Sequence, residues 1–359
     1  MTKSPPEPLR HVSLTRKVLV FTTRLVLTSI NQVVVVPGWW LVMILVQLLR
    51  FVDYSFYQKM ESLLYKHLLD LVAYWGWVEG YRVIESGADI QQLSSKRCLV
   101  LPNHQSTADI VTLFAVFHNK SEVTVNVMWV SDLELMFSHV GAVMKLHGDM
   151  FVRQKLGAAQ REKTLKDVET HMRNKFVAKR RRWCVVFPEG GFFRKRKAAS
   201  QQYSIKKGYP VFERLSGPRV FGVEKILQSV KEADPNYPFE YLLDVIIAYQ
   251  DQSRCVGLPD WLISGKYPEK VHVHYTAVPV STLKSEATED LERSLFKIWA
   301  EKEQKIQNFY KFGYFESEDE THKVCVFSNF RCVSLNLMYI FVTVFCAWPG
   351  AKLLYSLIV

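Results

Sequence analysis

The chain of 359 residues has few cysteines, and none of them lies close enough to another to suggest a paired function. Its six cysteines are scattered and form no Cys-X-X-Cys pair. This spacing indicates neither a zinc site nor a disulfide framework, and it is typical of reduced thiols in a cytosolic or membrane-buried chain. The sequence also lacks a Gly-X-Ser-X-Gly motif, which argues against a lipid hydrolase or transacylase with a serine nucleophile elbow.

Acidic residues are fewer than basic ones. The chain has 46 Lys and Arg against 35 Asp and Glu, a formal net charge of +11, and 48% hydrophobic residues. The hydrophobic content supports a packed core, and the charge favours an acidic partner: nucleic acid, an anionic membrane surface or a phosphorylated small molecule. The basic runs at residues 179–182 and 194–197 are short. We therefore expect no nucleic-acid partner.

Charge is absent from two long segments near the ends of the chain. Residues 25–49 exceed the roughly 20 residues that a helix needs to cross a bilayer, and a cleavable signal peptide has a shorter apolar core. Residues 332–351 form a second such segment, for which a buried or interfacial helix is the alternative. Pro37 and Pro349 interrupt these segments, so the sequence predicts either membrane-spanning helices or re-entrant hairpins.

Between the two ends, short apolar stretches alternate with helical patterns. The strand-like stretches are residues 81–84, 98–101, 123–129, 151–152, 183–187, 242–248 and 271–280. The helical patterns are residues 60–75, 156–176 and 288–310, and residues 231–238 read as a surface loop. This alternation predicts an α/β fold, a mixed sheet with helix cover, between N-terminal and C-terminal membrane helices.

Four regions follow from these patterns. We expect an N-terminal region with a membrane segment, an amphipathic connecting helix, a catalytic domain and a C-terminal membrane segment. Their expected limits are residues 1–55, 56–79, 80–312 and 313–359.

A histidine and an aspartate with four residues between them follow the second strand-like stretch. His104 could accept a proton near neutral pH, and Asp109 on its other ring nitrogen could fix the tautomer. The pairing requires His104 to lie in a turn and Asp109 in the first turn of a helix. The alternative is an ordinary helix start, in which Asn103 or Ser106 caps the helix and Asp109 complements its dipole.

A second strand-to-helix junction contains Glu189, Gly190 and Gly191. Paired glycines permit close approach of the backbone to a ligand, and amides at the start of the next helix can hold an anion or an oxyanion. Glu189 could then orient a polar substrate. The alternative is a turn that binds nothing. The flanking basic runs suit a phosphate-rich cosubstrate, lipid headgroups or plain solvent exposure.

Three other residues carry weaker signals. Arg153 follows a short strand and could pair with a phosphate, or it could be a surface arginine. His272 and His274 lie on one face of a strand, but no cysteine or acidic cluster joins them. Core or surface histidines are therefore favoured over metal ligands, and we expect no metal ion.

Taken in order, these motifs resemble the glycerophospholipid acyltransferase family. The resemblance rests on the Asn-His-X4-Asp run at residues 103–109, the segment 148–153 and the Phe-Pro-Glu-Gly run at residues 187–190. It extends through Pro218 and Arg219 over nearly the whole chain. Members of this family move an acyl chain from coenzyme A to a lysophospholipid or to glycerol phosphate.

The resemblance implies roles for particular residues. His104 and Asp109 would be catalytic, without a covalent enzyme intermediate. The implied substrate-binding residues are Asn103, Arg153, Glu189, Gly190, Gly191, Arg194, Pro218 and Arg219. Two departures from the family pattern point to an acceptor other than a bare phosphate monoester. Gly191 and Phe192 stand where threonine and arginine are usual, and the motif arginine is Arg153 rather than the next residue.

The resemblance also implies the substrates and the location. We expect transfer from acyl-CoA, a cosubstrate rather than a bound cofactor, to lysophosphatidylglycerol, lysophosphatidylinositol or lysophosphatidylethanolamine. The alternatives are a 1-acylglycerol-3-phosphate acyltransferase and a non-catalytic, membrane-anchored protein that binds anionic lipids. The expected location is the endoplasmic reticulum membrane, with multi-pass or hairpin anchoring and a cytosolic active site. A glycosylation sequon at Asn119 would report on this topology, and no oligomeric state is predicted.

Overall fold

A mixed β-sheet forms the centre of the computed structural model, which describes residues 14–78, 82–118, 120–153, 158–249, 270–283, 287–315, 323–326 and 328–358. Its strands are β1 (Arg82–Gly87), β2 (Cys98–Pro102), β3 (Val127–Asp132), β4 (Met150–Val152), β5 (Trp183–Val186), β6 (Tyr241–Tyr249), β7 (Lys270–Pro279) and β8 (Lys323–Val324). Within the described residues they lie in the order β4-β3-β5-β2-β6-β7-β1-β8. The predicted mixed α/β sheet is confirmed.

Strand direction brings the two predicted junctions to one edge of the sheet. β2 is parallel to both of its neighbours, with Val100 opposite Val185 of β5 and opposite Leu243 of β6. β7 is antiparallel to β6. The carboxyl ends of neighbouring parallel strands meet at the same edge, so the residues after β2 and the residues after β5 lie next to each other.

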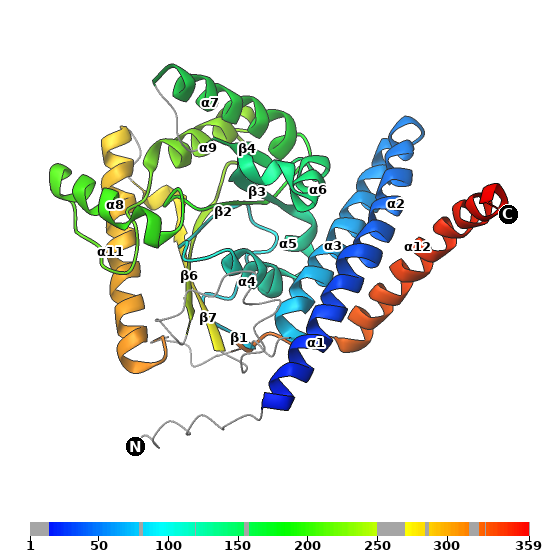
Figure 1. The fold of residues 1–359 in the computed structure, drawn as a ribbon. Coiled ribbons are helices and arrows are strands. Elements are labelled where there is room, and N and C mark those ends of the chain that lie inside the picture. The colour runs from blue at the N-terminus through cyan, green and yellow to red at the C-terminus, as the bar shows by residue number, and fades with distance from the viewer. Residues whose placement is uncertain are drawn as a thin grey trace.

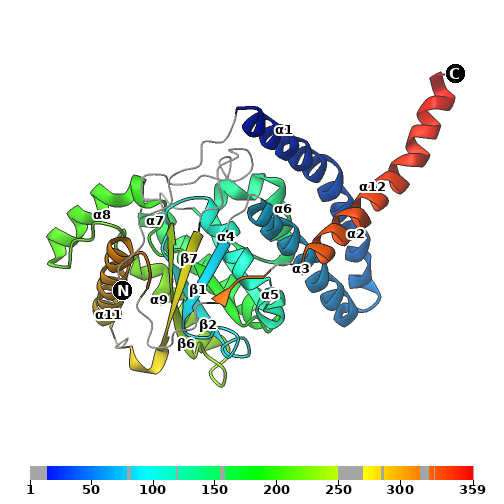
Figure 2. The same cartoon turned by 90° about the horizontal axis from the view of Figure 1, so that it is seen from below.

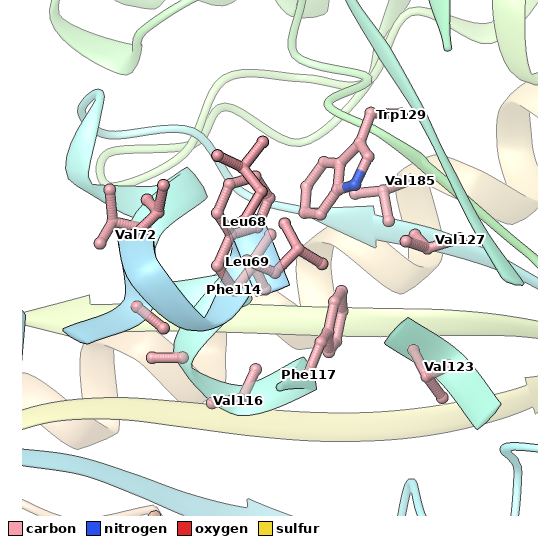
Figure 3. Packing of buried hydrophobic residues seen from close by; sticks show 14 of the residues in the cluster. Leu68, Leu69, Val72, Phe114, Val116, Phe117, Val123, Val127, Trp129 and Val185 are labelled. Atoms are coloured by element: carbon pink, nitrogen blue, oxygen red, sulfur yellow. The ribbon is translucent and has the colours of Figure 1, made fainter. Parts of the chain in front are cut away.

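Helices cover both faces of the sheet (Figures 1 and 2). On one face lie α3 (Tyr54–Val78), α4 (Ala108–Phe117), α5 (Ser121–Asn126) and α6 (His139–His147), and on the other α7 (Ala158–His171), α9 (Val220–Ala233) and α11 (Thr288–Phe312). Successive strand residues point to opposite faces, so Val100 packs on the first side and Leu99 on the second. Figure 3 shows Leu68, Phe114 and Trp129 packed together on the first side.

Two apolar helical segments lie beside this domain. α1 (Leu14–Ile30), a π-helical turn (Asn31–Val35) and α2 (Val36–Gln47) form one continuous path, and α12 (Asn329–Ile358) forms the other. The segments Phe21–Phe51 and Asn329–Pro349 are long and apolar enough to cross a membrane, with mean hydropathies of 2.0 and 1.7. Most of their surface is exposed, unlike that of a core helix, and α12 projects away from the domain (Figure 2).

The prolines end neither helix. Pro37 lies in the first turn of α2, just after the π-helical turn, where the backbone hydrogen bonds are already shifted. Pro349 lies inside α12, and the helix continues beyond it. The chain therefore forms a helix through each proline, and neither of the predicted re-entrant breaks occurs at these two positions.

The N-terminal and C-terminal apolar helices touch closely. A Cβ atom on Gly38 would lie 2.2 Å from the Tyr339 carbonyl oxygen of α12. Thr343 Oγ1 donates a hydrogen bond to the Val34 carbonyl at 2.6 Å, and Asn31 Nδ2 donates to Asn336 Oδ1 at 3.1 Å. Small residues and polar pairs of this kind hold helices together in membranes.

Two predicted elements differ from the structure. Residues 123–129 are not one strand, because the chain forms α5 before β3 begins at Val127. The Arg181 guanidinium donates to the Val125 carbonyl and the Arg182 amide donates to the Asn126 carbonyl, so distant residues satisfy the end of this short helix. The predicted loop at 231–238 begins only at Asp234, since α9 ends at Ala233.

Candidate active site

His104 and Asp109 meet at the carboxyl end of β2. His104 lies in the turn between β2 and α4, and Asp109 lies in the first turn of α4. His104 Nδ1 and Asp109 Oδ2 are 2.9 Å apart. The ordinary helix-start alternative holds in part, because Ser106 Oγ accepts the Ala108 amide at 3.0 Å, but it does not account for the bond between Asp109 and His104.

Hydrogen bonds to Asp109 fix its orientation and that of the imidazole. Its Oδ2 accepts the backbone amides of Gln105 at 2.7 Å and Ser106 at 2.9 Å, and its Oδ1 accepts the Tyr249 hydroxyl at 2.6 Å. Burial next to Asp109 raises the pKa of Tyr249, so this hydroxyl keeps its proton. A carboxylate only accepts hydrogen bonds, so His104 Nδ1 carries the hydrogen and Nε2 carries the lone pair.

The imidazole of His104 lies between aromatic rings but remains accessible. The ring centroid is 4.2 Å from that of Phe187 and 4.5 Å from that of Phe192. The side chain is 13% exposed, whereas that of Asp109 is fully buried. A base placed in this way can meet a substrate while the rings exclude most water from it.

Glu189 connects the junction after β2 to the junction after β5. Its Oε1 accepts the His104 amide and its Oε2 accepts the Ser216 amide, each at 3.2 Å. The Phe193 amide donates to the His104 carbonyl at 2.8 Å, so two hydrogen bonds connect the turn that carries His104 to the second junction. Burial raises the pKa of Glu189 to about 8, although Lys302 and the two amides act in the opposite direction. Glu189 is 1% exposed, and its hydrogen bonds hold the turn that carries His104 in place.

Gly190 and Gly191 allow an arginine to lie over the second junction. Their φ angles are +66° and +136°. A Cβ atom on Gly190 would lie 2.6 Å from Arg219 Nε, so only glycine leaves room for this guanidinium. Partial desolvation of the guanidinium lowers the pKa of Arg219, although the residue as a whole is exposed, and the charge of Arg196 lowers this pKa too. Arg196 Nε is buried without a hydrogen-bond partner among the described residues, and the charge of Arg196 acts on Arg219.

The remaining predicted binding residues are placed differently. Asn103 is fully buried, and its amide group exchanges hydrogen bonds with Ile247 at 2.7 and 3.1 Å, so its side chain anchors the turn to β6. Pro218 is buried, and Arg194 is exposed on α8 (Phe193–Lys207). Arg153 is exposed after β4, at the same edge but three strands from β2, or roughly 14 Å away. The binding roles of these four residues stay predictions.

Three residues of this region were not identified as site residues from the sequence: Ser216, Tyr249 and Lys302. They come from distant segments, and only the fold brings them to the turn. Lys302 had a usable signal, because it falls on the inward face of α11 between Trp299 and Ile306, where a charge is unusual. The strand histidines His272 and His274 pack against Phe309 and Phe315, and the described residues contain no group of three possible metal ligands.

Fold and site together define a membrane-associated α/β protein in which a histidine oriented by a buried aspartate lies at the end of a parallel strand. The sequence model of the Acyltransferase family matches residues 82–211. The chain is 32% identical to acyl-CoA:lysophosphatidylglycerol acyltransferase 1 of Mus musculus, over 91% of this chain and 90% of that protein. The Homo sapiens protein is 31% identical, over 92% and 91%. The 2-acyl-1-lysophosphatidylinositol acyltransferase of Saccharomyces cerevisiae is 28% identical, over 47% and 43%.

The chain belongs to this acyltransferase family, as its ordered motifs predicted.

Proposed function

We propose that this protein transfers a fatty acyl group from acyl-CoA to the hydroxyl group of a lysophospholipid, with His104 as the general base. The observation that carries the proposal is the hydrogen bond of His104 to a fully buried Asp109 at the end of β2, which leaves the basic Nε2 for a substrate. The relatives named for lysophosphatidylglycerol and lysophosphatidylinositol support a lysophospholipid acceptor.

The residues suit a direct transfer. The acceptor hydroxyl gives its proton to His104 Nε2 as its oxygen attacks the thioester carbonyl carbon. The tetrahedral intermediate then collapses, the C–S bond breaks, and the coenzyme A sulfur leaves with the proton from His104. The imidazolium formed between these steps is stabilised by Asp109. A backbone amide of the turn at residues 189–191 is the candidate for holding the oxyanion, other than that of Gly190, which donates to the Phe187 carbonyl at 3.1 Å.

The acceptor phosphate has candidate ligands near the base. Arg219 lies over the second junction and is affected by the charge of Arg196, while the threonine and arginine that usually follow Glu-Gly in the family are replaced here by Gly191 and Phe192. A pair of guanidinium groups can bind the phosphodiester of a lysophospholipid. We therefore place a phosphodiester acceptor, with lysophosphatidylglycerol first, ahead of glycerol-phosphate acceptors.

The location is part of the same proposal. Two exposed apolar helical segments associate the protein with a membrane, which is where both amphiphilic substrates are found. We propose the endoplasmic reticulum membrane and an active site on the cytosolic side, where acyl-CoA is available. The sequon at Asn119 lies outside the described residues, and an unmodified Asn119 would agree with this side.

A donor-and-acceptor panel tests the function. Purified protein in lipid nanodiscs receives labelled acyl-CoA and, in parallel, lysophosphatidylglycerol, lysophosphatidylinositol, lysophosphatidylethanolamine or lysophosphatidic acid. We expect labelled diacyl product with a phosphodiester acceptor. Transfer from a phospholipid donor without acyl-CoA would indicate a transacylase instead. Strong binding to anionic vesicles without turnover of any acceptor would establish a lipid-binding protein and refute the proposal.

A further inference from the structure

α11 carries a lysine that is fully buried beneath the catalytic turn. Lys302 is 0% exposed, and its Nζ lies 2.7 Å from Asp244 Oδ1 on β6. The same ammonium group donates a hydrogen bond to the Leu101 carbonyl at 2.9 Å and lies 4.0 Å from the centroid of the Trp299 ring. A lysine is rarely buried in this way, because removing its charge from water is costly.

The position of Lys302 in the fold links it to the reaction. Leu101 is the residue of β2 whose carbonyl precedes the turn with Asn103 and His104. Lys302 is also the charge that most strongly favours ionised Glu189, whose two oxygens accept the amides of His104 and Ser216. The ammonium group of Lys302 therefore binds the end of β2 directly, and its charge also favours the ionised form of Glu189.

We propose that Lys302 is a positioning residue for acyl transfer: its buried ammonium group holds the Leu101 carbonyl at the end of β2 and, together with the Glu189 carboxylate that accepts the His104 amide, fixes the turn that carries His104. A protonated Glu189 would lose acceptor strength at one oxygen and loosen one of the two amides. The inference rests on the proposed acyl transfer, since His104 must act as a base for the turn geometry to affect the rate.

Several other charged groups surround this pair. Asp109 of α4 raises the pKa of Glu189, while Arg219 lies above the neighbouring Gly190. Asp244 forms an ion pair with Lys302. On α11, Lys305 lowers the pKa of Asp244 and Glu301 raises it. The test must therefore isolate the contribution of Glu189.

The test measures the pH dependence of acyl transfer by Lys302→Met in nanodiscs. Burial places the pKa of Glu189 at about 8, so the wild-type rate should fall as the pH decreases through that value. Without the lysine charge, this acidic limb should move upward by about 1–3 pH units. Lys305→Met is the matched control, because Lys305 lies one turn along the same helix and contacts Thr276 and His274 on β7.

Two further variants identify the group that titrates. In a Glu189→Gln background, Lys302→Met should shift the limb much less, since no carboxylate remains to be ionised. Asp244→Asn removes the carboxylate that pairs with Lys302, so the lysine charge should act more strongly on Glu189 and the acidic limb should move to lower pH. This second variant keeps the inference testable if Lys302→Met does not fold. Opposite shifts for the two partners of one ion pair are not expected from a structural role.

Two results would overturn the inference while leaving acyl transfer intact. One is a rate of Lys302→Met that is reduced equally at every pH. The other is a limb shift that persists unchanged in the Glu189→Gln background. Absence of transfer by the wild-type protein with every donor and acceptor would instead refute the proposed function itself.

Discussion

At the scale of single residues, the proposed reaction depends on which nitrogen of His104 carries the hydrogen. Asp109 receives four hydrogen bonds, from His104, the amides of Gln105 and Ser106, and the hydroxyl of Tyr249. This arrangement keeps the carboxylate fixed and leaves the lone pair on Nε2, the atom proposed as the base. The pairing of His104 with Asp109 could be predicted from the sequence, because the two residues are close along the chain. The contact with Tyr249 could not, because only the fold brings that residue to Asp109.

Replacement of Asp109 by asparagine tests the tautomer directly. An asparagine amide can donate to His104 Nδ1 and so leave the hydrogen on Nε2, where a base is needed. We expect the rate of acyl transfer by Asp109→Asn to fall by about 10²–10⁴-fold with little change in fold. The comparison is with Tyr249→Phe, which removes one neutral donor and should lose far less activity. Equal losses in both variants would contradict the tautomer argument.

Gly190 tests the second junction. Gly190→Ala places a Cβ atom against the guanidinium of Arg219 and in a left-handed conformation that costs about 1–2 kcal/mol. Gly208→Ala is the matched control, because Gly208 has a φ of +71° with nothing within 4 Å of its Cβ position. We expect both variants to lose similar stability, measured by thermal unfolding, and only Gly190→Ala to lose acyl transfer. Full activity of Gly190→Ala would show that the position of Arg219 over the second junction is not needed for acyl transfer.

At the scale of elements, the sequence predicts the strands that are buried on both faces. The elements that it does not predict depend on partners far along the chain. β2 and β5 are continuous apolar runs because helices cover both faces of the sheet, and such runs are typical of parallel strands. α5 was mistaken for a strand, since its β-branched residues favour strands and its stabilising Arg181 and Arg182 lie far along the chain. α8 carries little apolar periodicity, and sequence reasoning missed it.

The contact between α2 and α12 also belongs to this scale. Gly38→Ala would bring a Cβ atom within 2.2 Å of the Tyr339 carbonyl, so the two helices would have to separate. We expect a lower melting temperature in detergent. Gly222→Ala is the control, because Gly222 lies inside α9 with open space around it, and it should gain about 0.5–1 kcal/mol. A stabilising effect at both positions would contradict the packing of α2 on α12.

At the scale of the whole molecule, the sheet joins chemistry to the membrane. The turn that carries His104 lies at the shared edge of β2 and β5, while the exposed apolar segments Phe21–Phe51 and Asn329–Pro349 lie beside the domain (Figure 1). The apolar composition of both ends predicted membrane association from the sequence alone. The close packing of the first segment on the last could not be predicted, because it depends on contacts between residues about 300 positions apart, such as Asn31 and Asn336.

The most direct test of the whole account is the initial rate of acyl transfer by His104→Ala in nanodiscs, with acyl-CoA and the acceptor that the wild-type protein prefers. His171→Ala, a substitution on α7 that leaves the catalytic turn intact, controls for loss of a histidine. We predict a fall of about 10²–10⁴-fold or more for His104→Ala and a near wild-type rate for the control. An unchanged rate in folded His104→Ala protein would contradict the assignment of His104 as the base.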